Sequence, residues 1–170
     1  MFTKNRKKLI KSLHQKKYRD AHGLFIVEGE KMTRELISLN SDDLGAKITD
    51  LYCISSLQES FPEAEIISSE DMSSITAFKT SPGILAVAEQ PALPELDLDR
   101  INSILILDDI KDPGNLGTII RSAEWFGIEV ILLSPQTVEL YNPKTVQSTM
   151  GSLFRATIYR GELEKMYLTL

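Results

Sequence analysis

Along the first 90 residues, apolar positions occur either at helical spacing or in short runs bounded by turn residues. Residues 4–19 are rich in lysine and arginine, and their few apolar positions fall at helical spacing, which predicts a basic surface helix. Apolar runs bounded by turn residues predict strands at 24–27, 48–54, 66–67 and 84–88, with helices ending near Leu39 and at about 57–61 and 70–78. Residues 40–45 have the composition of a turn. Strands and helices in alternation predict a small α/β domain.

A second alternation follows residues 90–100, which hold two prolines and four charged side chains without a clear period. That composition predicts a linker at 93–101 between a domain at 1–92 and another at 102–170. Strands are expected at 104–107, 130–133 and, more weakly, 156–159, with helices at 114–126, stopped by Gly127, and at 143–150. Nearly continuous apolar strands linked by helices predict a parallel sheet.

Charge is unevenly distributed along the chain. The net charge is −5, yet residues 1–34 hold ten basic and three acidic side chains. A concentrated basic end in an acidic chain has the charge pattern of a polyanion-binding surface. A solvated amphipathic helix has the same pattern, so charge alone leaves both interpretations open.

The cysteine count and the hydropathy limit the class of protein. The chain has one cysteine, Cys53, and it lies in an apolar run, so we expect it to be a buried small hydrophobic residue. One cysteine without a His/Cys cluster favours a reducing, cytoplasmic location and excludes a structural zinc site; no metal is expected. No apolar run approaches the roughly 20 residues of a membrane span, so no membrane association is predicted.

The first candidate for chemistry is DDIKDPGNLGTIIR, at 108–121, which follows an apolar strand and opens a helix. In open α/β sheets, ligands bind beyond the carboxyl ends of strands, where such loops lie. Asp112 suits a helix cap and Asn115 offers both a donor and acceptors. Arg121 lies seven residues after Gly114, on nearly the same helix face. The spacing matches neither GxGxxG nor a Walker loop, and a well-capped helix with a surface arginine is the alternative.

The second candidate is NPKTVQSTMGSLFR, at 142–155. It gathers four hydroxyl side chains beside Gly151 and Arg155; they are Thr145, Ser148, Thr149 and Ser152. One interpretation is a polar helix that ends in a glycine cap. The other is a polar loop that faces the first segment.

Together these segments resemble the first and second motifs of the SpoU/TrmH family of RNA methyltransferases, in the SPOUT superfamily. The N-terminal KKYRDAHGLFIVEGEKMTREL resembles the substrate-binding domain often joined to them. The resemblance implies a ribosomal-protein-like α/β domain followed by a parallel-sheet SPOUT (α/β knot) domain. Many members have Arg-Ala-Ser where this chain has Gln147, Ser148 and Thr149, so a positive charge is absent here. The family's third, glycine-rich motif would lie beyond Leu170, so we expect a domain incomplete at its C-terminus, without the knot.

The resemblance also implies an activity, the transfer of a methyl group from S-adenosylmethionine to a ribose 2′-hydroxyl of structured RNA (rRNA or tRNA). Related knotted enzymes methylate bases, so base methylation stays open. The alternative is a non-catalytic RNA-binding protein that retains the fold. RNA and, for the intact protein, a second copy in a homodimer are the expected partners.

The implied site residues fall into three groups. The catalytic ones are Arg121, with Glu124 as a possible partner one turn on, and Asn115, which would hold Arg121 or the ribose. Those for the cofactor are Thr149, Met150 and Gly151, and Ser152 could help to form the site. Those for RNA are Lys7, Lys8, Lys11, Lys16, Lys17, Arg19 and Lys144. Tyr18 or Phe25 could stack on an unpaired base, with a core position as the alternative.

Overall fold

The computed structural model describes residues 1–39, 46–92 and 101–164. The chain divides into two compact units, residues 1–91 and 92–170. The predicted turn at 40–45 and nearly all of the predicted linker at 93–101 lie outside the described residues. Each unit is described by itself below.

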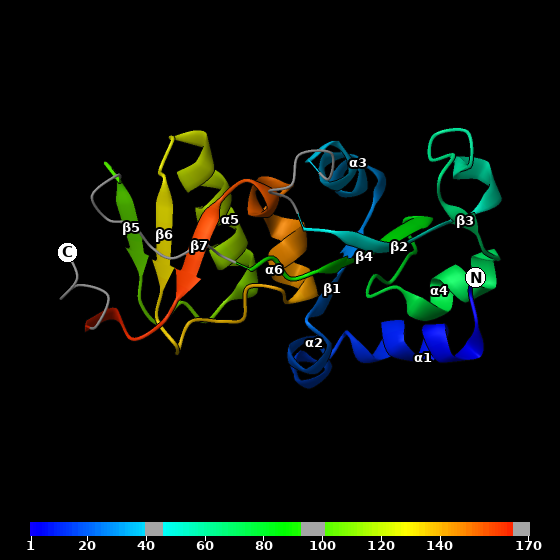
Figure 1. The fold of residues 1–170 in the computed structure, drawn as a ribbon, viewed down its shortest axis with the longest axis horizontal. Helices are drawn as coiled ribbons and strands as arrows, with labels where there is room; N and C mark the ends of the chain where they lie inside the picture. The colour runs from blue at the N-terminus through cyan, green and yellow to red at the C-terminus, as the bar shows by residue number, and fades with distance from the viewer. Residues whose placement is uncertain (40–45, 93–100, 165–170) are drawn as a thin grey trace. The chain divides into compact units, whose positions relative to one another are not determined.

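The N-terminal unit is built on a four-stranded sheet in the order β1-β4-β2-β3. Its strands are β1 (Leu24–Glu28), β2 (Ile48–Cys53), β3 (Glu65–Ile66) and β4 (Ile84–Glu89). Strand β4 runs antiparallel to both β1 and β2, and β3 runs parallel to β2. In Figure 1, α3 (Glu30–Leu39) lies above this sheet and α4 (Ser69–Ile75) below it. A short helix was predicted near 57–61; the structure has a 3₁₀ helix at Ser55–Leu57, followed by a turn at 58–60.

Apolar side chains fill both faces of this sheet. Central strand β4 is buried from Ile84 to Ala88 because helices cover it on each side. One cluster joins Ile10 and Met72 of the helices to Ile26 and Val87 of the sheet. The prediction for Cys53 is confirmed: its side chain is fully buried, and burial raises the pKa of its thiol.

The basic N-terminal segment forms two helices, so the single helix predicted over 4–19 is wrong. Helix α1 covers Lys4–Ser12 and α2 covers Lys16–His22. Between them, the Arg19 guanidinium donates a hydrogen bond of 2.7 Å to the Leu13 carbonyl. The ring of His14 is hydrogen-bonded to the Ile75 carbonyl at 2.8 Å. These two bonds satisfy backbone carbonyl groups at the ends of helices, which have no acceptor role within the helix. The hydrophobic periodicity of the sequence does not reveal such bonds.

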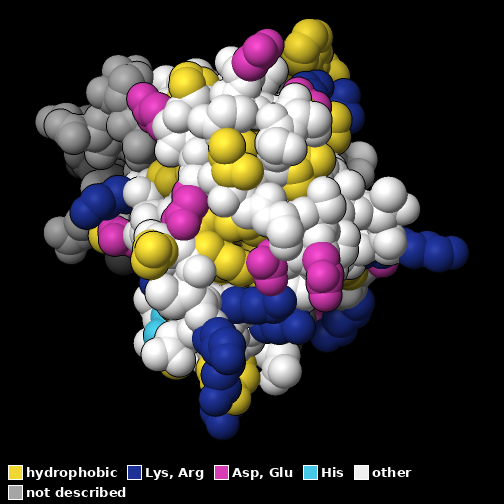
Figure 2. Space-filling model, turned by 90° about the vertical axis from the view of Figure 1, so that its right-hand side faces the viewer, with side chains coloured by type: hydrophobic (Ala, Val, Ile, Leu, Met, Phe, Trp, Pro, Cys, Tyr) yellow, Lys and Arg dark blue, Asp and Glu magenta, His cyan; other side chains and the backbone are white. Residues whose placement is uncertain are grey.

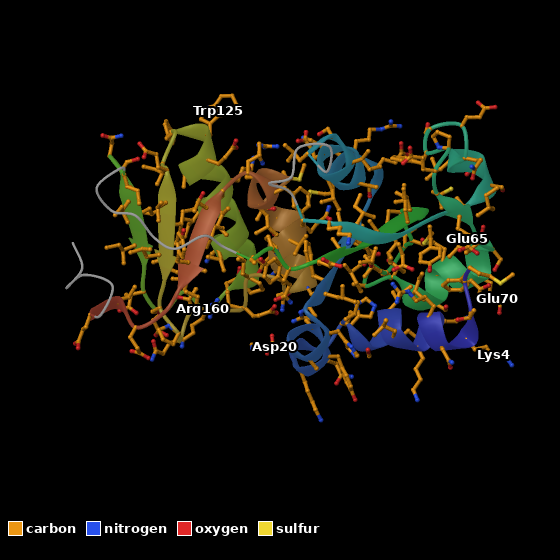
Figure 3. All side chains as sticks on the ribbon, in the orientation of Figure 1. Lys4, Asp20, Glu65, Glu70, Trp125 and Arg160 are labelled. Carbon is orange, nitrogen blue, oxygen red and sulfur yellow. The ribbon has the colours of Figure 1, made fainter. Side chains whose placement is uncertain are left out.

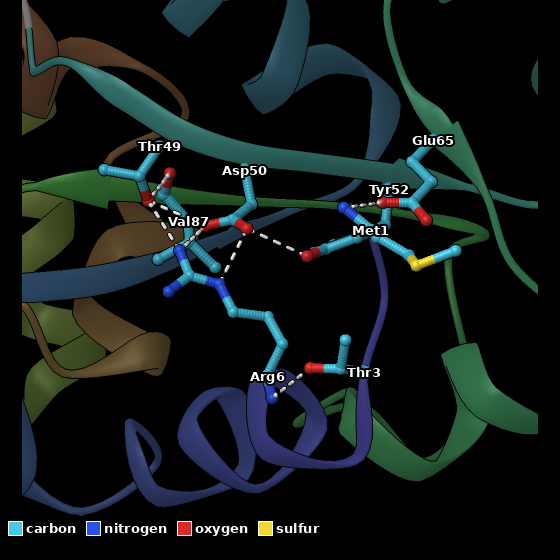
Figure 4. A network of polar contacts seen from close by, with 8 residues as sticks. All are labelled: Met1, Thr3, Arg6, Thr49, Asp50, Tyr52, Glu65 and Val87. Atoms are coloured by element: carbon cyan, nitrogen blue, oxygen red, sulfur yellow. Dashed lines mark hydrogen bonds and ion pairs between the residues drawn. The ribbon is translucent and has the colours of Figure 1, made fainter.

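Helix α1 is anchored to the sheet by an ionic network (Figure 4). The Arg6 guanidinium pairs with Asp50 of β2, with its Nε 2.7 Å from one carboxylate oxygen. The Tyr52 hydroxyl donates to the same oxygen at 2.8 Å. Thr3 caps the helix by accepting from the Arg6 amide. Because one guanidinium meets both oxygens of one carboxylate, the helix is held in one orientation on β2.

The C-terminal unit contains a three-stranded sheet in the order β5-β6-β7, and its strands are parallel, as predicted. Strands β5 (Ile104–Leu107), β6 (Val130–Leu133) and β7 (Thr157–Arg160) alternate along the chain with α5 (Pro113–Trp125) and α6 (Pro143–Ser148). A 3₁₀ helix (Ser152–Phe154) precedes β7. Gly127, at a φ of 73°, follows the end of α5 as expected. Helices α5 and α6 pack directly on each other.

The described residues hold neither a candidate membrane span nor a candidate metal cluster. The longest described helix, α5, has 13 residues, and none of the described helices has the length and hydropathy of a membrane span. The same residues contain no group of three or more His, Cys, Asp or Glu side chains that could hold a metal ion.

Candidate functional site

The first motif places its loop and helix start at the carboxyl end of β5. Asp112 caps α5 by accepting from the Asn115 amide at 2.8 Å, and the Lys144 ammonium lies 3.1 Å from the same carboxylate. The Asn115 bond, followed by that from Lys144, holds the pKa of Asp112 below its ordinary value. The Asn115 side chain is exposed and borders an open groove of about 480 Å³. The groove is lined by Asp109, Ile110, Lys111, Asp112, Asn115, Thr118 and Ile119.

Two hydroxyl groups after β6 hold the loop after β5. The Asp109 amide donates to Ser134 Oγ at 2.9 Å, and the Ile110 amide donates to Thr137 Oγ1 at 3.3 Å. Thr137 donates in turn to the Leu107 carbonyl. Asp109 has a φ of 57°, a conformation that costs a non-glycine residue roughly 1 kcal/mol or more. The hydroxyl bonds keep the loop in this shape, so the groove floor is preorganised.

Arg160, at the end of β7, stabilises the segment that follows β6. Its guanidinium donates to the carbonyls of Thr137 and Val138, both at 2.6 Å. Figure 3 shows the side chain at the end of the strand. Ser134, Thr137 and Arg160 were not predicted as site residues from the sequence. The available signal was that polar residues directly follow two neighbouring parallel strands, whose carboxyl ends share one edge.

The two motifs meet along one face of α5. A Cβ atom on Gly117 would lie 2.5 Å from Ser148 Cβ and 2.7 Å from the Thr145 carbonyl oxygen. One turn earlier, a Cβ atom on Gly114 would lie 3.3 Å from the Lys144 side chain. Glycine at position 117 therefore lets α5 and α6 approach at backbone distance, whereas Gly114 faces only side chains. The prediction that the second segment faces the first agrees with this contact.

Arg121 lies on this same face, between the Gly117 contact and the next contact at Glu124. Its side chain is exposed and forms no hydrogen bond or ion pair with the described residues. Asn115 does not hold it, contrary to one of the expected roles. Six positions along an α-helix separate two residues by about 9 Å and about 120°. The two predicted catalytic residues therefore belong to different sides of α5: Asn115 to the groove and Arg121 to the α6 side.

Glu124 does not pair with Arg121, so that expectation is also corrected. Its carboxylate accepts from Arg155 Nε at 2.9 Å and from the Ser152 hydroxyl at 3.1 Å. The Arg155 bond is the main reason that the pKa of Glu124 lies below its ordinary value. Glu124 thus joins the end of α5 to the second motif. Ser152 is buried in this contact and has a structural role rather than an exposed one.

The second motif turns sharply after α6. Thr149 is fully buried and its hydroxyl donates to the Val146 carbonyl at 2.7 Å, so its side chain faces the fold. Met150 and Gly151 follow in left-handed conformations, with φ of 52° and 98°. Of the three residues expected at the cofactor, Met150 has a partly exposed side chain and Gly151 contributes only backbone.

The N-terminal basic residues separate into distinct classes. Arg19 is 2% exposed and its guanidinium is bonded inside the domain, so its expected contact with RNA phosphates is wrong. Lys7 pairs with Asp71 at 2.7 Å, and Lys16 pairs with Asp20 at 2.5 Å. The remaining three, Lys8, Lys11 and Lys17, are exposed and form no ion pair with a described residue. Figure 2 shows basic side chains gathered at the lower edge of this unit, at the height of α1 in Figure 1.

Comparison with known proteins agrees with this geometry. Residues 102–168 match the model of the SpoU rRNA Methylase family, and residues 4–86 match the MRM3-like substrate binding domain. A TrmH-family putative RNA methyltransferase from Porphyromonas gingivalis is 30% identical, with a TM-score of 0.85 over 99% of this chain and 68% of that chain. An AdoMet-bound rRNA methyltransferase from Sinorhizobium meliloti is also 30% identical, with a TM-score of 0.81 over 99% and 66%.

A third relative is the 23S rRNA (guanosine(2553)-2′-O)-methyltransferase RlmP of Bacillus subtilis, 33% identical over 153 residues. The match covers 90% of this chain and 60% of that protein. Two family models that follow one another along the chain and a shared two-domain fold give one answer: the chain belongs to the SpoU/TrmH family of RNA methyltransferases. It spans about two thirds of the length of these relatives.

Proposed function

We propose that this chain is the RNA-binding domain and part of the catalytic domain of an S-adenosylmethionine-dependent methyltransferase for ribosomal RNA, acting on a ribose 2′-hydroxyl. One observation carries the proposal: the α5–α6 contact at Gly117 sets Arg121 on the side of the first motif that faces the second. Relatives named as rRNA 2′-O-methyltransferases support the substrate class. The base-methylating alternative has no such support among these names.

Arg121 is the residue that acts on the ribose. A guanidinium stays protonated in proteins, so it serves as a donor and not as a base. It orients the attacking hydroxyl and stabilises negative charge that develops on the oxygen. Asn115, about 9 Å along the helix, binds a neighbouring part of the RNA in the groove. Lys144, which pairs with Asp112, and Lys111, which pairs with Asp109, border the same loop and can exchange these carboxylates for a phosphate.

The residues present fit one edge of the cofactor. S-adenosylmethionine has an apolar adenosine face and polar ends, and it supplies a methyl group on a positively charged sulfur. Met150 offers a partly exposed apolar side chain, and Gly151, itself buried, turns the backbone beside it in a left-handed conformation. Thr149 supports this turn from inside through its bond to the Val146 carbonyl. Met150 and Gly151 are therefore the residues of this chain that would hold the cofactor.

We further propose that the intact protein is a cytoplasmic homodimer. Trp125 and Phe126, at the end of α5, are 83% and 80% exposed, which is uncommon for adjacent large aromatic side chains. Figure 3 shows Trp125 projecting from the helix. A second copy covering them would remove both rings from water. The cytoplasmic location rests on the single cysteine and on the bacterial 23S rRNA relative.

Transfer of labelled methyl groups to ribosomal RNA tests the function. The gene product with its native ends should label rRNA, and mapping should place the methyl group on a ribose. Arg121→Ala should lower turnover at least about a hundredfold, as expected for loss of transition-state stabilisation, while RNA affinity changes little. Exposed Ser122→Ala, one residue further along α5, is the control. RNA binding without methyl transfer to any rRNA would instead favour the non-catalytic alternative.

A further inference from the structure

The two N-terminal helices border a groove whose lining includes aromatic, apolar and polar side chains as well as basic ones. It has a volume of about 520 Å³, and the side chains that matter here are Lys8, Leu9, Lys11, Gln15, Tyr18 and His22. All of them come from α1, α2 or the short connection between these helices. This groove was hidden at the sequence level because a single continuous helix was expected there. It lies within the N-terminal unit and is distinct from the groove at Asn115.

An exposed aromatic ring stands in this groove. Tyr18 is 37% exposed, whereas Phe25, the other candidate for stacking, is fully buried. No described residue forms a hydrogen bond with the Tyr18 hydroxyl, so the ring is not held there by a polar contact within the domain. Leu9 adds a half-buried apolar surface to the same groove. An aromatic face beside an aliphatic side chain suits the flat face of a nucleobase.

Positive charge is available at the same place. Lys8 and Lys11 are three residues apart on α1, so they project from one side of the helix. Neither forms an ion pair with a described residue, unlike Lys7 and Lys16. The Lys17 ammonium lies 5.8 Å from the centroid of the Tyr18 ring, so a third cation stands beside the aromatic surface. Lysine ammonium groups around an aromatic surface suit a nucleotide whose base stacks on the ring and whose phosphate lies beside the ammonium groups.

The groove also has polar groups that can read a base edge. Gln15 and His22 line it, and both side chains combine donor and acceptor capacity. A base inside an RNA duplex does not present its face, and the deep major groove of A-form RNA excludes side chains. Only an unpaired nucleotide offers a face, an edge and a phosphate together.

We propose that the α1–α2 groove binds one unpaired RNA nucleotide, with its base stacked on Tyr18 and its flanking phosphates at Lys8 and Lys11. This proposal rests on the RNA-binding function proposed above and specifies where the RNA is held and in what form. It makes the N-terminal domain selective for a loop or bulge in the substrate.

Binding of short fluorescent RNAs to the 170-residue chain tests the groove. A single-stranded hexamer should bind more tightly than the same sequence in a duplex. Tyr18→Ala should weaken binding of the single strand about tenfold, within the range of stacking measured by alanine substitution, and Tyr18→Phe should bind like the unmodified chain. A 2-aminopurine base in the hexamer should be quenched on binding, and Tyr18→Ala should abolish the quenching.

The lysines have a separate readout. Replacing Lys8 and Lys11 together by glutamine should lower the slope of log affinity against log salt by about 1.4, because each single-strand phosphate contact contributes about 0.7. Tyr18→Ala should leave that slope unchanged. Lys31→Gln, on α3 at the other side of the N-terminal sheet in Figure 1, is the charge-matched control and should change neither quantity.

Several results would overturn the groove. They are equal affinity for duplex and single strand, an effect of Tyr18→Ala below twofold, or competition by polyglutamate as effective as that by RNA. The last result would reassign the surface to an acidic protein partner. Failure of the proposed methyl transfer with Tyr18-dependent binding intact would leave the groove standing. If methyl transfer is observed but Tyr18→Ala does not affect single-strand binding, the proposed nucleotide binding in the groove is wrong and the proposed methyltransferase function stands.

Discussion

Gly117 of α5 and Ser148 of α6 lie so close that a Cβ atom on the glycine would be 2.5 Å from that of the serine. Together with the bonds of Glu124 to Ser152 and Arg155, this contact joins the helix that bears Arg121 to the segment that bears Met150 and Gly151. The neighbouring Thr145 carbonyl oxygen, 2.7 Å from the same point, belongs to the backbone and cannot rotate away. The spacing between the two motifs therefore depends on the absence of a side chain at position 117.

Gly117→Ala should destabilise the C-terminal unit. The added methyl group forces α5 and α6 apart, and overpacking of this kind costs about 1 to 3 kcal/mol. Urea unfolding followed by circular dichroism would measure the change. Ser122→Ala, on an exposed position of the same helix, should leave the unfolding midpoint unchanged or slightly higher because alanine favours helix. If Gly117→Ala has the same unfolding midpoint as the unmodified chain, the two helices can move apart without a loss of stability.

Glu124 and Arg155 should show a small coupling energy. Their side chains are 29% and 35% exposed, and ion pairs of this exposure contribute only about 0.5 kcal/mol after solvent screening. Because the pKa of Glu124 is lowered in the folded state, the stabilisation is present above its ordinary value of 4.5. It is lost as the pH falls through the lowered value. A double-mutant cycle with Glu124→Gln and Arg155→Gln at neutral pH measures the coupling, and a value of zero would contradict the assigned pair.

Buried Glu28 should make stability fall as the pH rises. Burial raises the pKa of its carboxyl, although hydrogen bonds from the Thr76 hydroxyl and the Ala77 amide, and the nearby His14, oppose this. A folded-state pKa above the ordinary 4.5 favours folding below that pH and loses this contribution as the pH rises through the raised value.

Glu28→Gln removes this titration and keeps an oxygen for the Ala77 amide. The difference in unfolding free energy between this variant and the unmodified chain should therefore change in favour of the variant between pH 4 and pH 8, roughly the window in which a raised glutamate titrates. Glu70→Gln, exposed on α4, is the control for the substitution itself. A constant difference for Glu28→Gln would mean that its carboxyl ionises as easily when folded as when unfolded.

Arg19→Met should cost stability and not only charge. The variant leaves the Leu13 carbonyl without the guanidinium bond, and a hydrogen bond to a charged group contributes about 1.5 to 3 kcal/mol. Lys17→Met, two residues earlier and exposed, should change the unfolding free energy by less than about 0.5 kcal/mol. Thermal unfolding of both variants makes the comparison. Similar melting temperatures would place Arg19 at the surface in solution.

The regular elements were predictable from local pattern. Strand β6 has its predicted bounds of 130–133 because four apolar residues in succession, between turns, suit a strand buried on both faces. Helix α5 differs from prediction by one residue at each end, since Asp112 and Gly127 mark its limits chemically. The motifs were likewise visible because they are contiguous in the sequence.

Side-chain partners that regular helical spacing does not bring together were not predictable. Nothing near Glu124 along the chain indicates Arg155 as its partner, and an arginine one turn away was the reasonable local expectation. Arg19 looks like the lysines around it, yet it is buried because Leu13 presents a carbonyl that only the folded chain brings within reach. In both cases a tertiary contact decided between side chains that are locally equivalent.

In the proposed binding mode, Arg19 influences RNA without touching it. By bonding the end of α1 from within α2, it fixes the angle at which the two helices meet, and with it the width of the groove around Tyr18. A lysine at this position would keep the overall charge and the electrostatic attraction for RNA while losing the forked geometry that holds the bend. In the proposed binding mode, selection for the shape of the RNA depends on this buried hydrogen bond, and the residues that set it need not appear in any footprint of the bound RNA.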